Sequence, residues 1–307
     1  MFPDFLNNPR HFRPDVVQYA QYQIRKRRVP YDFKRRRLCL CADLFVSLIL
    51  PVAVLIVFAV KKKNSGVVSA WLLGAAAFFV PQILIRIPLL NALYGNAGFA
   101  AFMQNHVISA SLFLAFTAGL FELAGRYVAA RIMSKNLTFR RSLAAGLGHG
   151  GIEAMYIVGI AYLNNLIYIS MIRSGTFDAM AAQIAAAGVD VTQLNAVRDA
   201  LINTSAGVFL LAGLERLLTM ISHAAMTVIV CYGVHTKHTA KGLLICLGIH
   251  TLIDTAAGIP SMTAKVLPQS AAFAVVYAIL FAVAAASVLI LKNIRKNWVP
   301  AGANPQA

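Results

Sequence analysis

Seven long apolar stretches constrain the fold of this 307-residue chain more than any other feature of its sequence. Hydrophobic residues make up 59% of the chain and charged residues only 13%, and a soluble domain of this size could not bury so much apolar surface. A stretch of about 20 apolar residues is long enough to cross a bilayer as a helix. The sequence therefore predicts an all-α fold, a polytopic integral membrane helical bundle of about seven transmembrane helices. These are expected at about 38–60, 67–93, 107–132, 143–169, 208–234, 242–258 and 271–291.

The apolar stretches divide the chain into one membrane domain and its polar surroundings. The membrane domain is expected over residues 38–291, between a basic polar N-terminal tail (1–37) and a basic C-terminal tail (292–307). Residues 173–204 hold acidic and basic side chains in rough balance and contain two short helical patterns. We predict that this segment is a loop outside the membrane with short helices lying at the surface.

The net charge of +17 is distributed as in a membrane protein rather than a nucleic-acid-binding protein. Basic residues cluster beside the apolar stretches, and they do not alternate with aromatic residues as on an RNA-binding sheet. The positive-inside rule predicts a plasma (cytoplasmic) membrane protein with a cytoplasmic C-terminus. With seven spans the N-terminus would then lie outside, and its basic tail would violate the same rule, so the side of the membrane on which the tail lies stays open. Anionic lipid is the expected partner of the basic segments, and no nucleic-acid partner is expected.

One apolar stretch contains an imidazole and a carboxylate. His149 and Glu153 lie four residues apart, so their side chains share one face of a helix. Ionisable groups at membrane depth are costly and are therefore candidates for function. Glycines in the same region remove side chains, which allows another backbone or a substrate to approach. These glycines are Gly146, Gly148, Gly150 and Gly151.

Two later stretches bring similar groups to a similar depth. Counting along a helix from the flanking basic residues places His149 roughly 12 Å and Glu153 roughly 18 Å below the cytoplasmic face. The same count gives roughly 21 Å for His223, roughly 13 Å for His250 and roughly 20 Å for Asp254. Three histidines and two acids therefore share one layer near the middle of a core that is about 30 Å thick. Such a layer favours a functional site over separate interhelical hydrogen bonds.

Histidines and carboxylates in one layer can bind a transition metal, because imidazole suits Zn²⁺ and carboxylate can complete or orient the ligand shell. The predicted cofactor is Zn²⁺ or another divalent transition metal. A zinc ion with three protein ligands and an open position makes water a nucleophile at neutral pH, and a nearby carboxylate can take the proton. Glu122 and Arg126, also four residues apart, are interpreted instead as a structural pair that neutralises itself.

Two other classes of function could use the same buried groups. A catalytically inactive membrane scaffold or partner protein would keep the helices and bind no metal, so stoichiometric zinc in purified protein would count against it. A transporter coupled to protons or metal ions would use the buried His and Asp side chains. Substrate-dependent flux in proteoliposomes, without cleavage of any peptide, would favour the transporter.

Four segments of the sequence resemble the YhfC family. They are 82–90 (QILIRIPLL), 148–153 (GHGGIE), Glu215-Arg216 ahead of His223, and 250–254 (HTLID), and the resemblance covers about residues 40–291. Members are regarded as intramembrane metalloproteases related to CAAX prenyl endopeptidases and bacteriocin-processing proteins. The final motif of that larger group is matched at 250–254 and its middle histidine at His223, although Thr219 stands where the group has an aromatic residue.

The resemblance implies an endopeptidase that hydrolyses a peptide bond of a membrane protein or a lipid-associated peptide, within or beside the bilayer. It leaves two candidates for the general base. The first motif of the larger group has two adjacent glutamates followed by an arginine, and Glu122 with Arg126 matches it except that Phe121 replaces the first glutamate. Depth and the neighbouring His149 favour Glu153. The resemblance also extends to a scaffold, the anterior-pharynx-defective subunit of γ-secretase.

The residues and the resemblance together predict one site with named roles. The expected metal ligands are His149, His223 and His250. Glu153 is expected to act as the general base, and Asp254 to orient His250 or to stabilise the developing oxyanion.

Overall fold

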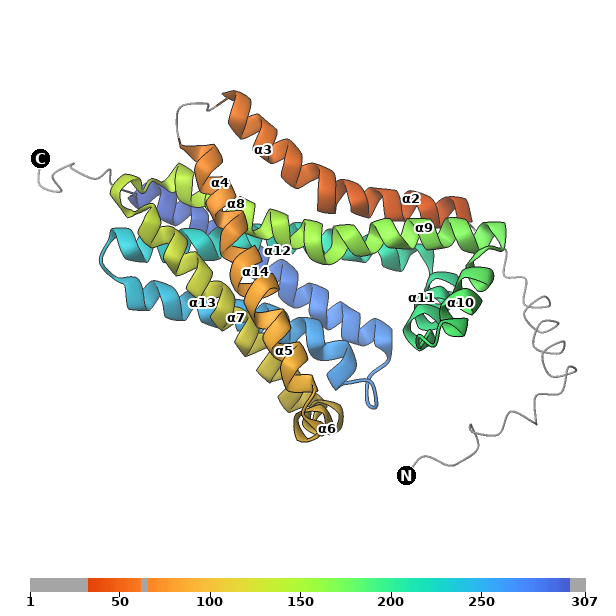
Figure 1. The fold of residues 1–307 in the computed structure, drawn as a ribbon. Coiled ribbons are helices and arrows are strands. Elements are labelled where there is room, and N and C mark those ends of the chain that lie inside the picture. Colours follow the sequence, from red (N-terminus) through yellow and green to blue (C-terminus); the bar gives the residue numbers. More distant parts are fainter. Residues whose placement is uncertain (1–32, 62–65, 299–307) are drawn as a thin grey trace, which may run out of the picture.

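The computed structural model describes residues 33–61 and 66–298. Within this part of the chain the backbone forms helices joined by turns, without strands. Seven of its helical stretches are long and apolar enough to cross a membrane, which confirms the predicted all-α, polytopic fold (Figure 1).

The seven stretches contain the following elements. The first is α2 (Phe33–Leu44), η3 (Phe45–Ile49) and α3 (Leu50–Lys61), and the second is α4 (Val67–Phe78), η4 (Phe79–Arg86) and α5 (Ile87–Tyr94). The third is α7 (Val107–Ile132), and the fourth is α8 (Phe139–Glu153), η6 (Ala154–Gly159) and α9 (Ile160–Ser174). The last three are α12 (Ala206–His235), α13 (Thr239–Met262) and α14 (Gln269–Asn297). The shorter elements are α6 (Ala97–Asn105), η5 (Ser134–Asn136), α10 (Phe177–Ala186) and α11 (Thr192–Asn203).

The outer helices continue past the apolar stretches into the predicted tails. α2 begins at Phe33 and contains the run of basic residues before Leu38, and α14 continues to Asn297 with Arg295 and Lys296 in its last turn. Exposed basic side chains allow this, because their stems lie along apolar surface while their charges reach water. Arg36 is an exception, since it is buried and donates from Nη1 to the carbonyl oxygen of Leu201. The remaining tail residues, 1–32 and 299–307, lie outside the described residues.

α12 is the central helix of the bundle (Figure 1). It packs against α2, α7, α8, α13 and α14. In its most apolar window 78% of the residues are buried inside the protein, more than in any other of the seven stretches. Polar side chains on α12 therefore face other helices, and they must find their partners there.

Close backbone contacts in the glycine-rich stretch hold α8 between α4 and α12. A Cβ atom on Gly148 would lie 2.0 Å from the carbonyl oxygen of Trp71 in α4, and one on Gly146 would lie 2.6 Å from Cα of Ala224 in α12. A side chain at either position would push the helices apart. These two glycines thus allow the approach of another backbone, which is one of the two roles that the sequence left open.

Two π-helical segments lie next to buried polar residues. η6 begins directly after Glu153, and π-helical turns are frequent at functional sites. η4 ends with Arg86, whose Nη2 donates to the carbonyl oxygen of Leu114 at 2.7 Å and to Oγ1 of Thr117 at 3.1 Å, both in α7. Arg86, which no sequence pattern explained, therefore fastens the second stretch to α7.

α10 and α11 lie beside one end of α9, at the edge of the bundle (Figure 1). They are too short to cross a bilayer, and Arg198 of α11 pairs with Asp178 of α10 at 3.3 Å. Asp190 precedes α11 and accepts hydrogen bonds from the backbone N–H and the hydroxyl of Thr192, which hold the pKa of Asp190 below its ordinary value. α10 and α11 are thus joined by an ion pair outside the long helices.

The α7–α8 turn, the α12–α13 turn and the end of α14 meet at one end of the bundle. Trp298 joins them, because its ring centroid lies 6.2 Å from that of Phe139, 5.5 Å from that of Tyr232 and 4.8 Å from that of His235. We call this the basic end, after the residues Arg131, Lys135, Arg140, Arg141, Lys237, Lys241, Arg295 and Lys296. The positive-inside rule predicts that the basic end faces the cytoplasm.

Candidate metal site

Four helices place ionisable side chains in one buried cluster. The glutamate of α7 and the three histidines lie ten to twelve residues from the point where their helices meet the basic end. At a rise of about 1.5 Å per residue, the four groups share a layer about 15–18 Å from that end. The buried members of the cluster are Glu122 and Arg126 on α7, His149 and Glu153 on α8, His223 on α12 and His250 on α13.

The carboxylate of Glu122 lies at the centre of the cluster. Its Oε2 is 2.9 Å from Nε2 of His149 and 2.7 Å from Nε2 of His250. The same oxygen accepts a hydrogen bond from Nη2 of Arg126 at 3.3 Å. The ion pair expected from the sequence is therefore present but is not isolated, since one carboxylate oxygen of α7 also contacts histidines of α8 and α13.

Glu153 provides a second carboxylate with a different environment. Its Oε1 accepts a hydrogen bond from Nη1 of Arg216 at 3.1 Å, and Arg216 also pairs with Glu215. Its Oε2 lies 3.0 Å from Nε2 of His223, but the two groups are not aligned for a hydrogen bond, and this buried oxygen has no hydrogen-bond partner in the described structure. One oxygen of Glu153 is thus held by a cation, while the other lies beside His223 without a hydrogen bond.

The three histidine rings pack against one another. The ring centroids of His149 and His223 are 5.3 Å apart with the planes nearly parallel, and those of His223 and His250 are 5.4 Å apart with the planes perpendicular. Phe78 of α4 packs its ring at a steep angle to that of His149, at 5.5 Å. All three imidazoles are buried, so none of them faces lipid.

Asp254 lies at the edge of the cluster. Its Oδ2 is 3.4 Å from Nδ1 of His250, and its side chain is 33% exposed. His250 therefore lies between two carboxylates, with Nε2 toward Glu122 and Nδ1 toward Asp254. The contact with Asp254 is not a hydrogen bond, since Nδ1 of His250 has no hydrogen-bond partner among the described residues.

Four of these side chains meet the geometric requirement of a metal site. Glu122, His149, Glu153 and His223 each offer one ligand atom, and these atoms lie within 4.8 Å of one another. Imidazole nitrogens and carboxylate oxygens are donors that bind Zn²⁺ in proteins, at about 2.0–2.2 Å. A buried carboxylate oxygen without a hydrogen-bond partner, Oε2 of Glu153, is a second feature suited to a metal ligand. The residues present therefore fit a divalent transition metal.

The structure brings the five residues predicted from the sequence into contact with one cluster, but it groups them differently. His149 and His223 belong to the four-donor group. His250 lies outside that group and contacts it through Glu122. Asp254 contacts His250, as one of its two predicted roles requires.

The cluster also contains Glu122, Arg126 and Arg216. The sequence interpretation treated Glu122 and Arg126 as a structural pair, kept Glu122 only as the alternative base through the family resemblance, and gave Arg216 no role of its own. A depth count could have found Glu122, because it lies nine residues from Arg131, the same separation as that of His250 from Lys241. Arg216 lies seven residues before His223 and thus on the same face of α12. Its role could not be read from spacing alone, because its partner Glu153 is on another helix.

Comparison with known proteins identifies the family of the chain. Residues 46–277 match the profile of the YhfC intramembrane metalloprotease family, and this range includes every member of the cluster. The uncharacterized membrane protein YhfC of Bacillus subtilis (strain 168) is 30% identical over 195 residues, which cover 62% of this chain and 72% of that protein. No solved structure matches the chain at a significant level. Because the family profile matches most of its length, the chain belongs to the YhfC intramembrane metalloprotease family.

Proposed function

We propose that this protein is an intramembrane metal-dependent endopeptidase. Its substrate would be a membrane protein or a lipid-associated peptide, cleaved within or beside the bilayer. The observation that carries the proposal is the buried group of four ligand atoms from three helices, all within 4.8 Å of one another. The family description points to the same chemistry. Buried ionisable groups are costly in a membrane, so a functional role is the simplest reason to keep them.

In this proposal, Zn²⁺ or another divalent transition metal is held by His149, His223 and Glu122. Two imidazoles and one carboxylate form a ligand set found in zinc peptidases. The ion supplies positive charge that polarises the scissile carbonyl and makes the attacking water more acidic. The carboxylate of Glu122 takes the third position, which the sequence prediction gave to His250, because Glu122 belongs to the four-donor group and His250 does not.

Glu153 acts as the general base. Its Oε2, which lies 3.0 Å from Nε2 of His223, accepts the proton of the water whose oxygen attacks the carbonyl carbon, and it returns that proton to the amine nitrogen when the C–N bond breaks. Arg216 holds the other oxygen of the same carboxylate at 3.1 Å. The arginine therefore fixes the orientation of Glu153 without occupying the oxygen that receives the proton.

His250 and Asp254 position the carboxylate of Glu122. Nε2 of His250 lies 2.7 Å from Oε2 of Glu122, and Oδ2 of Asp254 lies 3.4 Å from the other ring nitrogen. Partners of this kind, which orient a metal ligand, typically change metal affinity by about 10–100-fold when they are removed.

Metal analysis combined with one conservative variant tests the proposal. Detergent-purified wild-type protein should contain stoichiometric zinc and should cleave a model transmembrane peptide. Glu153→Gln keeps size and hydrogen bonding but cannot accept a proton, so it should retain zinc while cleavage slows by about 10²–10⁴-fold. The matched control is Glu215→Gln, which also removes a carboxylate partner of Arg216 but leaves the cluster intact. A metal-free wild type, or a fully active Glu153→Gln variant, would overturn the proposal.

A catalytically inactive membrane scaffold is the second candidate function. The observation in its favour is that the cluster pairs its own charges, since Arg126 contacts Glu122 and Arg216 contacts Glu153. The fold would then need no ion to neutralise its buried carboxylates. A scaffold predicts no bound zinc and no cleavage in the wild type, so the same metal analysis separates the two candidates.

A further inference from the structure

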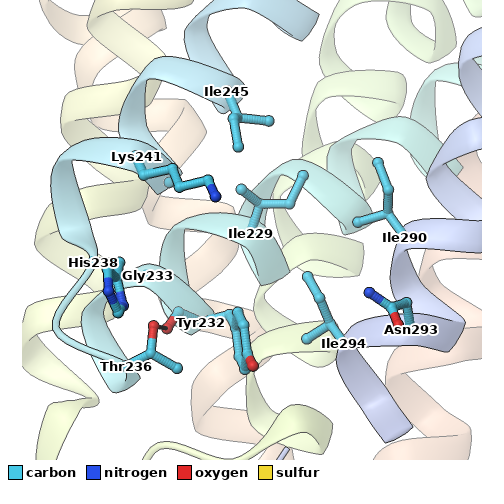
Figure 2. A pocket seen from close by; sticks show the side chains of 11 residues that line it. Ile229, Tyr232, Gly233, Thr236, His238, Lys241, Ile245, Ile290, Asn293 and Ile294 are labelled. Carbon is cyan, nitrogen blue, oxygen red and sulfur yellow. Dashed lines mark hydrogen bonds between the residues drawn. The ribbon is translucent and has the colours of Figure 1, made fainter. Parts of the chain in front are cut away.

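A cavity at the basic end of the bundle lies apart from the candidate metal site. It is formed by α12, α13, α14 and the α12–α13 turn, and its volume is about 380 Å³ (Figure 2). None of its 11 lining residues belongs to the cluster described above. Cavities of about 300–1,000 Å³ are typical of sites for small ligands.

The wall of the cavity has an apolar part and a polar part. The apolar part consists of four isoleucines from three helices, and the polar part consists of side chains from the α12–α13 turn and the helix ends around it. The isoleucines are Ile229, Ile245, Ile290 and Ile294, and the polar residues are Tyr232, Thr236, His238, Lys241 and Asn293. A ligand that fits this wall has a polar group joined to an apolar body.

The charge of the wall selects an anion. Lys241 is the cationic side chain among the lining residues, and no lining residue is an Asp or a Glu. Figure 2 shows its side chain reaching across the hollow, with the nitrogen toward Ile229. His238 and Asn293 offer further nitrogen atoms at two sides of the same hollow. These groups can donate hydrogen bonds to phosphate oxygens.

The apolar wall continues onto the outer surface of the bundle. Ile245 is 41% exposed, and its neighbour Leu244 is 71% exposed. A chain that leaves the cavity beside Ile245 would therefore enter hydrocarbon rather than water. The cavity itself lies among the basic residues of the bundle end, which is the level at which lipid head groups meet a membrane protein.

We propose that this cavity binds one anionic phospholipid. The phosphate lies beside Lys241, and the first part of an acyl chain lies along the isoleucine wall. A soluble phosphate compound would leave the apolar wall uncovered, and a zwitterionic lipid would bring its own cation close to Lys241. An anionic lipid satisfies both parts of the cavity.

Native mass spectrometry of the detergent-purified full chain tests this site. The protein is titrated with dioleoyl phosphatidylglycerol, with dioleoyl phosphatidylcholine, and with phosphatidylglycerol in the presence of excess glycerol 3-phosphate. Lys241→Gln is compared with Lys237→Gln, which removes the same charge four residues away from a position that does not line the cavity. Ile245→Trp, which fills the cavity, is compared with Leu244→Trp on the adjacent exposed position. Thermal unfolding in detergent confirms that each variant is folded.

The wild type should bind one phosphatidylglycerol in preference to phosphatidylcholine, without competition from glycerol 3-phosphate. Lys241→Gln and Ile245→Trp should each weaken this binding by about tenfold, because a hydrogen bond to a charged group or the space for the chain is lost. Their controls should change it less than about twofold. Equal effects of Lys241→Gln and Lys237→Gln would show unspecific attraction to the basic end and would overturn the site. Equal binding of both lipids, or displacement by glycerol 3-phosphate, would overturn the choice of ligand.

Discussion

The guanidinium of Arg126 lies against the imidazole of His223, with Nη2 2.6 Å from Nδ1. A guanidinium has only donors, so Nδ1 of His223 is the acceptor and carries no proton. A neutral His223 then has its proton on Nε2, the nitrogen that lies 3.0 Å from Oε2 of Glu153. An imidazole binds a metal through a lone pair, so binding through Nε2 would move the proton to Nδ1 and break the contact with Arg126. The metal and Arg126 therefore compete for His223.

Arg126→Gln should bind zinc more tightly than the wild type. The metal no longer has to break a hydrogen bond to a charged group, which is worth about 1.5–3 kcal/mol and corresponds to about 10–150-fold in affinity. The metal-free variant should unfold more easily, because Glu122 loses its cation in a buried site. Competition with a zinc chelator measures the affinity, and thermal unfolding in detergent measures the stability.

Arg216→Gln is the matched control for this prediction. It also removes a buried arginine, but Arg216 contacts Glu153 and Glu215 rather than a histidine ligand. Its zinc affinity should rise less than that of Arg126→Gln. Equal changes in the two variants, or no change in either, would contradict the competition for His223.

Removal of Glu122 and removal of His250 should affect the metal differently. Glu122→Gln replaces a proposed ligand, so bound zinc should be lost. His250→Ala removes a residue that reaches the four-donor group through Glu122, so zinc should remain with an affinity lowered by about 10–100-fold. Zinc content and chelator competition distinguish the two results. Complete loss of zinc in His250→Ala would instead support the ligand role that the sequence predicted for His250.

The fold could be predicted from the sequence because the bilayer sets the length of a spanning helix. The seven apolar stretches and the layer of polar groups both follow from the rise of a helix and the position of flanking charges. His149, His223 and His250 could be placed at one depth in this way. Their contact with one another depends on the direction in which each helix faces, which residue counting does not provide.

Contacts between distant segments explain why the rest of the site was missed. Glu122 reaches two histidines because α7 turns the same face to α8 and α13. Asp43 of α2 shows the same limit, since its Oδ1 accepts a hydrogen bond from the backbone N–H of Gly213 in α12. A Cβ atom on Gly213 would lie 2.3 Å from that oxygen, so the approach needs a glycine 170 residues away. No local pattern in the sequence indicates such a partner.

The basic end should face the cytoplasm. Its three neighbouring turns and helix ends carry eight arginine or lysine residues, which the positive-inside rule keeps on the cytoplasmic side. A fluorescent protein fused after residue 307 should therefore fluoresce, and alkaline phosphatase at the same position should be inactive. The opposite pattern would contradict the predicted orientation. The same fusions at the N-terminus test whether all seven long helical stretches cross the membrane, because seven crossings place the two termini on opposite sides.

Gly148→Ala should loosen the contact between α8 and α4 and thereby disturb the metal site. The added Cβ atom would lie 2.0 Å from the carbonyl oxygen of Trp71 and 2.8 Å from its carbonyl carbon. These are backbone atoms, so the helices themselves must move apart, at a cost of about 1–3 kcal/mol or more. His149 follows Gly148 directly, so zinc affinity should fall together with the thermal stability in detergent.

Gly248→Ala is the matched control, because Gly248 also lies in a transmembrane helix and a Cβ atom there would have no atom within 4 Å. Alanine at an open helical position should leave stability unchanged or raise it by up to about 1 kcal/mol. Zinc affinity should stay at the wild-type value, since Gly248 touches no proposed ligand. If Gly148→Ala were as stable and as tightly zinc-bound as Gly248→Ala, the close approach of α8 to α4 would not be what positions His149.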